Sequence, residues 1–157
     1  MIIGDPYKAA FLIERIPEWE KDHWKNGIML VIINGEMYPK EVRTTTFNSE
    51  LPSLLAANSA FAHPISDRSL YNKTASEILE YISDDENENY YRYFIPFHEI
   101  ENSGYRFYIL SDGRSIKILI CEFIDGEFIL KDKTELSMRE YEDIKSKLIG
   151  FYTECEF

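Results

Sequence analysis

The pattern of apolar and turn-forming positions is most regular in residues 105–133. Three runs of β-branched and aromatic residues are separated there by Asp112-Gly113 and Asp125-Gly126. Such dipeptides suit tight type I′ turns, because both central residues need a positive φ that Asp tolerates and Gly adopts without steric cost. Residues 105–133 therefore predict a three-stranded antiparallel meander. Its middle run, residues 115–123, is apolar on both faces, which predicts a strand covered on each side.

Apolar runs outside the meander predict further strands. Asn34-Gly35 is a third type I′ signal, and it joins residues 27–33 to the short run 36–38. Residues 18–26 predict a loop or a single helical turn whose two tryptophans pack on the sheet. The predicted strands outside the meander are residues 9–16, 27–33, 36–38, 41–48 and 90–96.

Residues 67–82 have apolar positions at steps of three and four, which is the spacing of one helix face. The helix can begin at Asp67, or later at a capping box formed by Thr74 and Glu77. Residues 51–60 carry a proline near their start and good helix formers after it, so they predict a shorter helix.

Residues 138–149 predict the clearest helix, because Ser137 and Glu140 form a capping box before it and Gly150 follows it as an end signal. Together these elements predict an α+β fold, with an antiparallel β-sheet of roughly six to eight strands. The sheet is built of meander hairpins and covered by two or three helices. At 157 residues the chain has the length of one domain, and residues 1–157 are expected to form it.

Composition places the chain among folded proteins, because 45% of its residues are hydrophobic and 15% are aromatic. Cys121 and Cys155 are too few for a disulfide framework and predict two reduced thiols in a cytosol. The opening MIIGDPYKAA has no basic segment followed by an apolar one, and no apolar run has membrane-spanning length. We therefore expect a cytoplasmic protein with no membrane partner.

The formal net charge of -11 bears on the kind of partner. It argues against nucleic acid, because phosphate contacts need a basic stripe and the 17 Lys and Arg residues are scattered. It permits a cationic partner, although an acidic balance can also serve only to keep a small protein soluble. The sequence does not indicate an oligomeric state.

A search for catalytic or metal-binding motifs finds none with the required spacing. His23, His63 and His98 are far apart, the seven glycines stand singly, and no serine lies in a G-x-S-x-G context. Cys121 lies in an apolar run, where a thiol is usually inert. We predict no catalytic residue, no cofactor and no metal. An enzyme whose carboxylates and histidines converge only in the fold is an open alternative.

The aromatic run in residues 90–96 leaves a second alternative, a small-ligand or peptide-binding module. In that case Tyr90, Tyr91, Tyr93 and Phe94 line a cleft, whereas in a plain sheet strand they occupy both faces. A deep, closed pocket would favour the binding module, and flat exposed surfaces would count against it.

An ordered series of features fills the first third of the chain: a Gly-Asp-Pro-Tyr element, a strand, a tryptophan-containing segment, a Lys-Asn-Gly and an apolar strand ending in Asn-Gly. The residues are Gly4, Asp5, Pro6, Tyr7, Trp19, Trp24, Lys25, Asn26, Gly27, Asn34 and Gly35. This series resembles the start of immunity protein family forty-two of bacterial polymorphic toxin and contact-dependent inhibition systems.

The resemblance implies a small cytosolic protein that binds one cognate toxin and neutralises it by protein–protein inhibition. The partner it implies is the C-terminal domain of that toxin, and the protein itself has no enzymatic activity. Many toxins of such systems are nucleases with basic surfaces, which an acidic inhibitor complements.

Residues 84–101 hold the densest acidic cluster of the chain, with six acidic residues and a single basic one, Arg92. We predict that its first carboxylates face a basic toxin surface, with one tyrosine beside them as an aromatic anchor. The alternative is a solvated loop without a binding role. The residues predicted to bind the partner are Asp84, Asp85, Glu86, Glu88, and Tyr90 or Tyr91.

Overall fold

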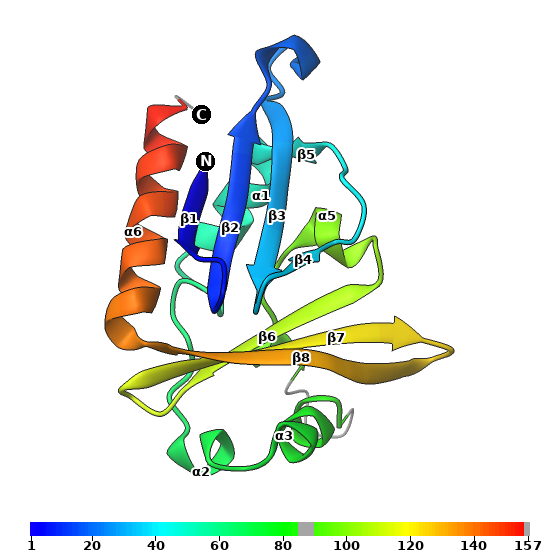
Figure 1. The fold of residues 1–157 in the computed structure, drawn as a ribbon, viewed down its shortest axis with the longest axis vertical. Coiled ribbons are helices and arrows are strands. Elements are labelled where there is room, and N and C mark those ends of the chain that lie inside the picture. The colour runs from blue at the N-terminus through cyan, green and yellow to red at the C-terminus, as the bar shows by residue number, and fades with distance from the viewer. Residues whose placement is uncertain (85–89, 156–157) are drawn as a thin grey trace.

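The computed structural model describes residues 1–84 and 90–155, which form two antiparallel sheets surrounded by helices (Figure 1). The strands are β1 (Ile2–Asp5), β2 (Ala9–Arg15), β3 (Asn26–Ile33), β4 (Glu36–Tyr38), β5 (Thr45–Thr46), β6 (Tyr105–Ser111), β7 (Ser115–Ile124) and β8 (Glu127–Ser137). The helices are α1 (Phe47–Leu55), α2 (Arg68–Tyr71), α3 (Ala75–Ile82), α4 (Tyr90–Tyr93), α5 (His98–Glu101) and α6 (Met138–Glu154), with a 3₁₀ helix at Pro17–Trp19.

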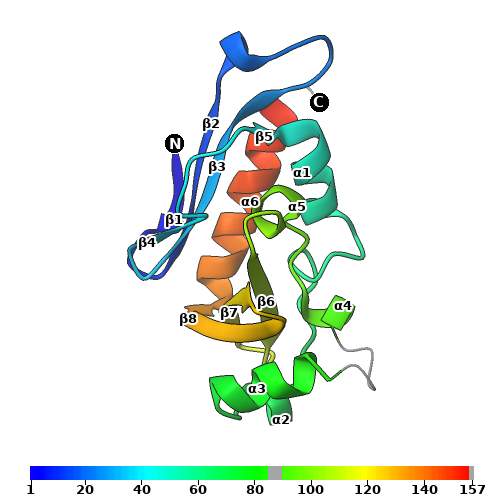
Figure 2. The ribbon, with the colours of Figure 1, turned by 90° about the vertical axis from the view of Figure 1, so that its right-hand side faces the viewer.

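The strands confirm the predicted α+β class but divide into two sheets. The first sheet has the order β1-β2-β3-β4, with β5 also paired to β3, and the second is the meander β6-β7-β8. Helices α1, α5 and α6 cover one face of the first sheet, while α2 and α3 lie under the second sheet (Figures 1 and 2). The main hydrophobic core fills the space between the two sheets and α6.

Strand β7 is covered on both faces, as its sequence predicts. Ile116, Ile118 and Ile120 belong to the core between the sheets. Leu119 and Cys121 point to the opposite face and pack in a second cluster with α2 and α3. The continuous apolar run of β7 is therefore explained by two separate layers of cover.

Two of the three predicted type I′ turns are confirmed, and the third is not. Asn34 and Asp125 have φ of 51°, and the glycine after each also has positive φ. At Asp112-Gly113 only the glycine has positive φ. Here the Asp112 carboxylate accepts the backbone N–H groups of Arg114 and Ser115 at 2.8 and 2.7 Å, so a side-chain cap closes a longer connection.

The stretch from residue 67 to 82 contains two helices instead of one, because both possible start signals are used. The Asp67 carboxylate accepts the backbone N–H of Leu70 and begins α2. Thr74 and Glu77 then form the capping box that begins α3. Each N-cap begins its own helix, so two caps seven residues apart give two short helices with a non-helical connection between them.

Several predicted boundaries are wrong. Residues 41–48 contain only the two-residue strand β5, and α1 begins directly after it at Phe47, which is buried against Phe151 of α6. Helix α6 continues through Gly150 to Glu154, because glycine can adopt α-helical backbone angles as well as end a helix. The tryptophans of residues 18–26 are nearly half exposed instead of packed on the sheet.

The prediction of a strand at residues 90–96 is also wrong. The run begins as helix α4, and Phe94 makes a single bridge with Tyr108 of β6. Tyr93 is buried beneath this turn, where α4 contacts the second sheet. Alternating aromatic residues therefore reflect an extended segment that follows a helical turn, outside the regular ladder.

Candidate functional site

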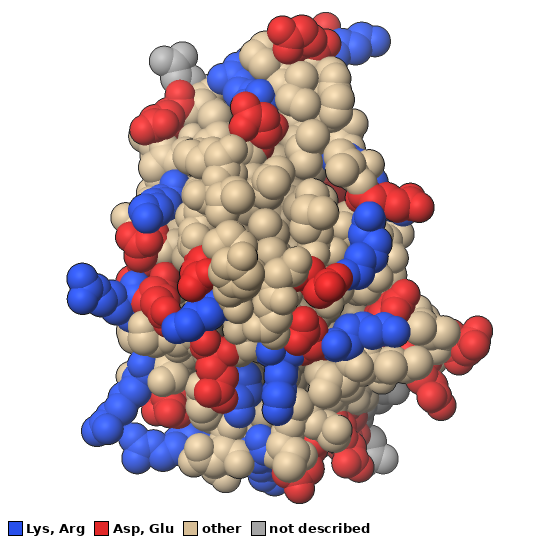
Figure 3. All heavy atoms as spheres, in the orientation of Figure 1, with Lys and Arg blue, Asp and Glu red and all other residues tan. Residues whose placement is uncertain are grey.

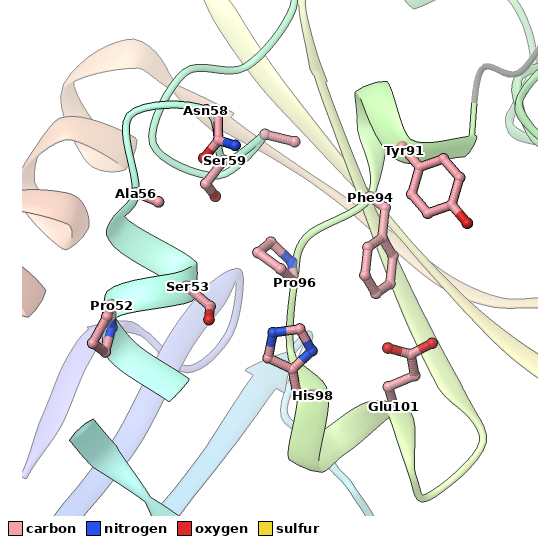
Figure 4. A pocket seen from close by; sticks show the side chains of 11 residues that line it. Pro52, Ser53, Ala56, Asn58, Ser59, Tyr91, Phe94, Pro96, His98 and Glu101 are labelled. Carbon is pink, nitrogen blue, oxygen red and sulfur yellow. The ribbon is translucent and has the colours of Figure 1, made fainter. Parts of the chain in front are cut away.

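An open groove of about 760 Å³ lies between α1 and the α4–α5 segment (Figure 4). One wall comes from α1 and the turn that follows it, and the other comes from α4, the extended residues after it, and α5. The lining residues are Pro52, Ser53, Ala56, Asn58, Ser59, Ala60, Tyr91, Phe94, Pro96, His98 and Glu101.

The α1 wall is rigid, because the opposite face of the helix is anchored in the core. Leu51 and Leu54 are fully buried there, while Pro52 and Ser53 face the groove. The Ser53 hydroxyl donates to the backbone carbonyl of Ser49 at 3.1 Å, so it is held against the helix. This wall offers small side chains and a proline ring, which leave room for a partner's side chains.

The second wall follows a strict alternation of residues 93–98. One set is almost fully buried, and the other set lines the groove (Figure 4). The buried residues are Tyr93, Ile95 and Phe97, and the groove residues are Phe94, Pro96 and His98. The extended residues between α4 and α5 alternate between core and groove, and His98 at the start of α5 adds an imidazole beside the Phe94 ring and Pro96.

Glu50 joins the two walls below the groove. It lies on α1, it is fully buried, and its Oε2 accepts the backbone N–H of Glu99 on α5 at 3.2 Å. Its other carboxylate oxygen, Oε1, has no hydrogen-bond partner among the described residues. The pKa of Glu50 is raised to about 7, mainly by burial and also by the nearby Glu99 and Glu101 carboxylates, against the lowering effect of the backbone N–H groups of Glu99 and His98.

At the rim of the groove, Glu101 and Tyr91 are the side chains best placed to meet a partner. Glu101 pairs with Arg106 at 3.2 Å, and the same guanidinium donates to the Glu101 carbonyl at 2.9 Å. Tyr91 is 81% exposed and projects from α4 at the groove's edge (Figure 4). A partly exposed carboxylate, here Glu101, beside an exposed aromatic ring, here Tyr91, is typical of the rim of a protein–protein interface.

The structure places two of the predicted partner-binding side chains on the surface. Asp84 is exposed at the end of the α3 segment, and Tyr91 lines the groove. Tyr90 begins α4. Asp85, Glu86 and Glu88 lie outside the described residues. The groove residues of α1 were not predicted, since Pro52, Ser53 and Ala56 form an ordinary helix pattern with no sequence signal of binding.

The three histidines lie on three different segments of the described fold. The ring of His23 lies against that of Trp24, with 4.5 Å between the ring centroids. His98 lines the groove, and His63 lies in the connection after α1. In residues 1–84 and 90–155, no three His, Cys, Asp or Glu side chains lie in a metal-binding arrangement. Burial raises the pKa of the Cys121 thiol to about 12, which disfavours the nucleophilic thiolate.

The pockets also bear on the small-ligand alternative. Tyr91 and Phe94 line the groove as that alternative requires, but Tyr93 is buried and the groove is open. The apolar cavity between the two sheets holds only about 20 Å³, which is room for little more than one water molecule. An open groove of this kind suits a segment of a larger partner better than an enclosed small molecule. Among the described helices, none is both long and apolar enough to cross a membrane.

Comparisons with known proteins give two findings and one negative result. A family model described as Immunity protein 42 matches residues 1–151. The crystal structure of CdiI from Burkholderia dolosa AUO158 is similar in fold, with a TM-score of 0.71 and 13% sequence identity over 96% of this chain and 99% of that chain. A search of curated proteins gives no match.

Proposed function

The chain belongs to the immunity protein 42 family and neutralises a toxin, and on this premise we propose that the groove beside Tyr91 is its toxin-facing surface. The observation that carries this proposal is the 81% exposure of Tyr91 at the rim of a 760 Å³ groove. Large aromatic side chains set among polar neighbours are where the energy of protein–protein binding concentrates.

The partner we propose is the C-terminal domain of the cognate toxin, with a basic surface such as a nuclease carries. The net charge of -11 supports this, because opposite charges raise the association rate and help to orient the partner. Glu101 lines the groove at which Tyr91 projects, and Asp84 is exposed after the end of α3. A toxin surface that binds nucleic acid through Lys and Arg would meet these carboxylates first.

We further propose that the protein acts in the cytoplasm as a stoichiometric inhibitor without catalysis of its own. Rigid walls, a buried hydrogen bond between them and an aromatic rim suit the binding of a protein partner. The purified chain should show no hydrolase, nuclease or transferase activity, and metal analysis should find no stoichiometric ion. One equivalent of zinc, lost when His23, His63 or His98 is replaced, would overturn this part of the proposal.

The groove is tested with Tyr91→Ala and a matched control. The probe is the C-terminal toxin domain encoded beside the gene for this chain, carrying a substitution that disables its activity. Tyr91→Ala should speed dissociation about tenfold or more, the effect of losing an anchor worth ~1.4 kcal/mol. Tyr7 is 84% exposed in the turn between β1 and β2 and does not line the groove, so Tyr7→Ala removes the same kind of side chain at another site. Equal dissociation rates for the two variants would show that the groove does not bind the toxin.

A further inference from the structure

The tip of the β7–β8 hairpin carries three large apolar side chains that the fold leaves exposed. Phe123 is 47% exposed, Ile124 is 36% exposed and Ile129 is 41% exposed. The hairpin extends beyond both hydrophobic clusters and projects from the body of the molecule (Figure 1). We infer that this tip is a second contact for the toxin and inserts into an apolar recess bordered by basic side chains. This inference rests on the immunity function proposed above.

The ladder register explains why apolar groups appear on both faces of the tip. Phe123 lies opposite Phe128, and their rings are 5.1 Å apart on the face that leads to α3. Ile124 and Ile129 point to the other face, because neighbouring positions in a strand alternate. Neither of the two hydrophobic clusters of the described residues includes Ile124 or Ile129. The apolar side chains of the tip are therefore available for another surface to cover.

Carboxylates lie beside these apolar groups, so a partner with positive charge around its recess would complement the tip. Glu122 is paired with Lys131 at 3.0 Å, whereas Asp125 and Glu127 form no ion pair within the part of the chain that the structure describes. Figure 3 shows acidic side chains gathered where the hairpin projects on the right. A second copy of this acidic chain would bring like charges together at this tip, so the charge favours a basic partner.

The tip is continuous with the groove, so one partner can contact both. The backbone N–H of Phe123 donates to the carbonyl of Gly104 at 2.9 Å, and Gly104 lies just after α5, whose Glu101 lines the groove. In Figure 2 the hairpin points toward the viewer between α3 and α5.

A row of rings also runs from the groove to the tip. The ring centroids of Phe94 and Tyr108 are 6.3 Å apart, and those of Tyr108 and Phe128 are 6.4 Å apart. The Phe128 ring in turn contacts the Phe123 ring. These packed rings fix the position of the tip relative to the groove wall. A partner would therefore meet two preformed contacts at a set separation, which reduces the ordering cost of binding.

Two double variants separate the apolar and the charged parts of the tip. Ile124→Thr with Ile129→Thr keeps β-branched residues in the strands and should speed dissociation of the disabled toxin domain about tenfold. Asp125→Asn with Glu127→Gln keeps a residue that tolerates positive φ at position 125 and should slow association at low salt. Ile149→Gln, on the exposed face of α6, is the control and should bind like the parent. Thermal unfolding of each variant verifies the fold.

The outcomes distinguish this inference from the groove proposal. If both tip variants bind like the parent while Tyr91→Ala dissociates faster, the tip is not a contact and the groove proposal stands. If the tip variants are impaired and Tyr91→Ala is not, the tip is a contact and the groove proposal fails. If sedimentation of the chain alone shows an oligomer that the isoleucine variant converts to a monomer, the tip is a self-association surface and the inference is overturned.

Discussion

The carboxylate of Glu50 accepts the backbone N–H of Glu99 at 3.2 Å and so joins two helices that are far apart in the sequence. Glu50 is fully buried on α1, and Glu99 lies in α5, so the contact fixes the spacing of the two groove walls. A buried carboxylate is costly when it is ionised and one of its oxygens, like Oε1 of Glu50, has no hydrogen-bond partner among the described residues. The groove walls are therefore held by a group whose charge depends on pH.

This contact predicts that the protein becomes more stable as the pH falls from about 8 to about 5. The folded-state pKa of Glu50 is about 7, above the ordinary 4.5, so the folded state binds a proton more readily. The stabilisation is complete below about 4.5 and is lost as the pH rises through about 7, a difference of roughly 3 kcal/mol. Carboxylates with lowered pKa values, such as Glu20 and Glu140, titrate below this window.

Glu50→Gln isolates the effect, because glutamine keeps an acceptor for the Glu99 N–H and does not titrate. Urea unfolding of both proteins at several pH values measures the difference in the free energy of unfolding. At about pH 8 the variant should be the more stable protein, and its advantage should disappear on acidification. Parallel pH profiles for the two proteins would mean that the pKa of Glu50 is the same in the folded and the unfolded protein.

Replacement of Ile118 tests the double-sided cover of β7. Ile118 is buried in the core between the sheets, so Ile118→Ala should lower the free energy of unfolding by about 2 to 5 kcal/mol. Val42→Ala, at an exposed position before β5, should change it by less than about 0.5 kcal/mol. A denaturation midpoint for Ile118→Ala near that of the control would contradict the placement of the central strand.

Two glycines should respond to alanine in opposite ways. At Gly27 in β3, a Cβ would lie 2.0 Å from the carbonyl oxygen of Glu14, so the two strands would have to separate. At Gly150 in α6, nothing lies within 4 Å of an added Cβ, and alanine should stabilise the helix by about 0.5 to 1 kcal/mol. Thermal melts of both variants check the signs, and a stabilised Gly27→Ala protein would contradict the strand register.

Local signals in the sequence predicted the elements whose ends they define. The turn at Asn34-Gly35 and the capping box at Ser137 need only neighbouring residues, and both form as expected. Gly150 illustrates the limit of such signals, because the helix continues through it to Glu154. A glycine permits a helix to end, but it does not force the helix to end when the residues after it can also adopt helical backbone angles.

Features that depend on distant contacts could not be predicted in the same way. The aromatic residues 90–96 suit a strand, but burial of Tyr93 against the second sheet favours a helical turn at their start. The groove has the same origin, since Pro52 and Pro96 meet only in the fold. The sequence identified Tyr91 as a possible anchor, but it had no signal for the opposite wall.

The acidic cluster that begins at Asp84 should speed the approach of a basic toxin surface. Neutralising its four carboxylates to Asn or Gln should slow association with the disabled toxin domain and flatten its dependence on salt, because rim charges act mainly on the association rate. Three of these residues lie outside the described ones. The residues replaced are Asp84, Asp85, Glu86 and Glu88.

A matched variant removes four carboxylates elsewhere and so changes the net charge by the same amount. Its residues are exposed and form no ion pair among those that the structure describes: Glu18, Asp22, Glu41 and Glu154. If only the total charge guides the toxin, both variants should slow association equally at low salt. If the cluster faces the toxin, its variant should be the slower one, and the difference should vanish at high salt. A cluster variant that associates as fast as the parent at low salt would place the toxin on another surface.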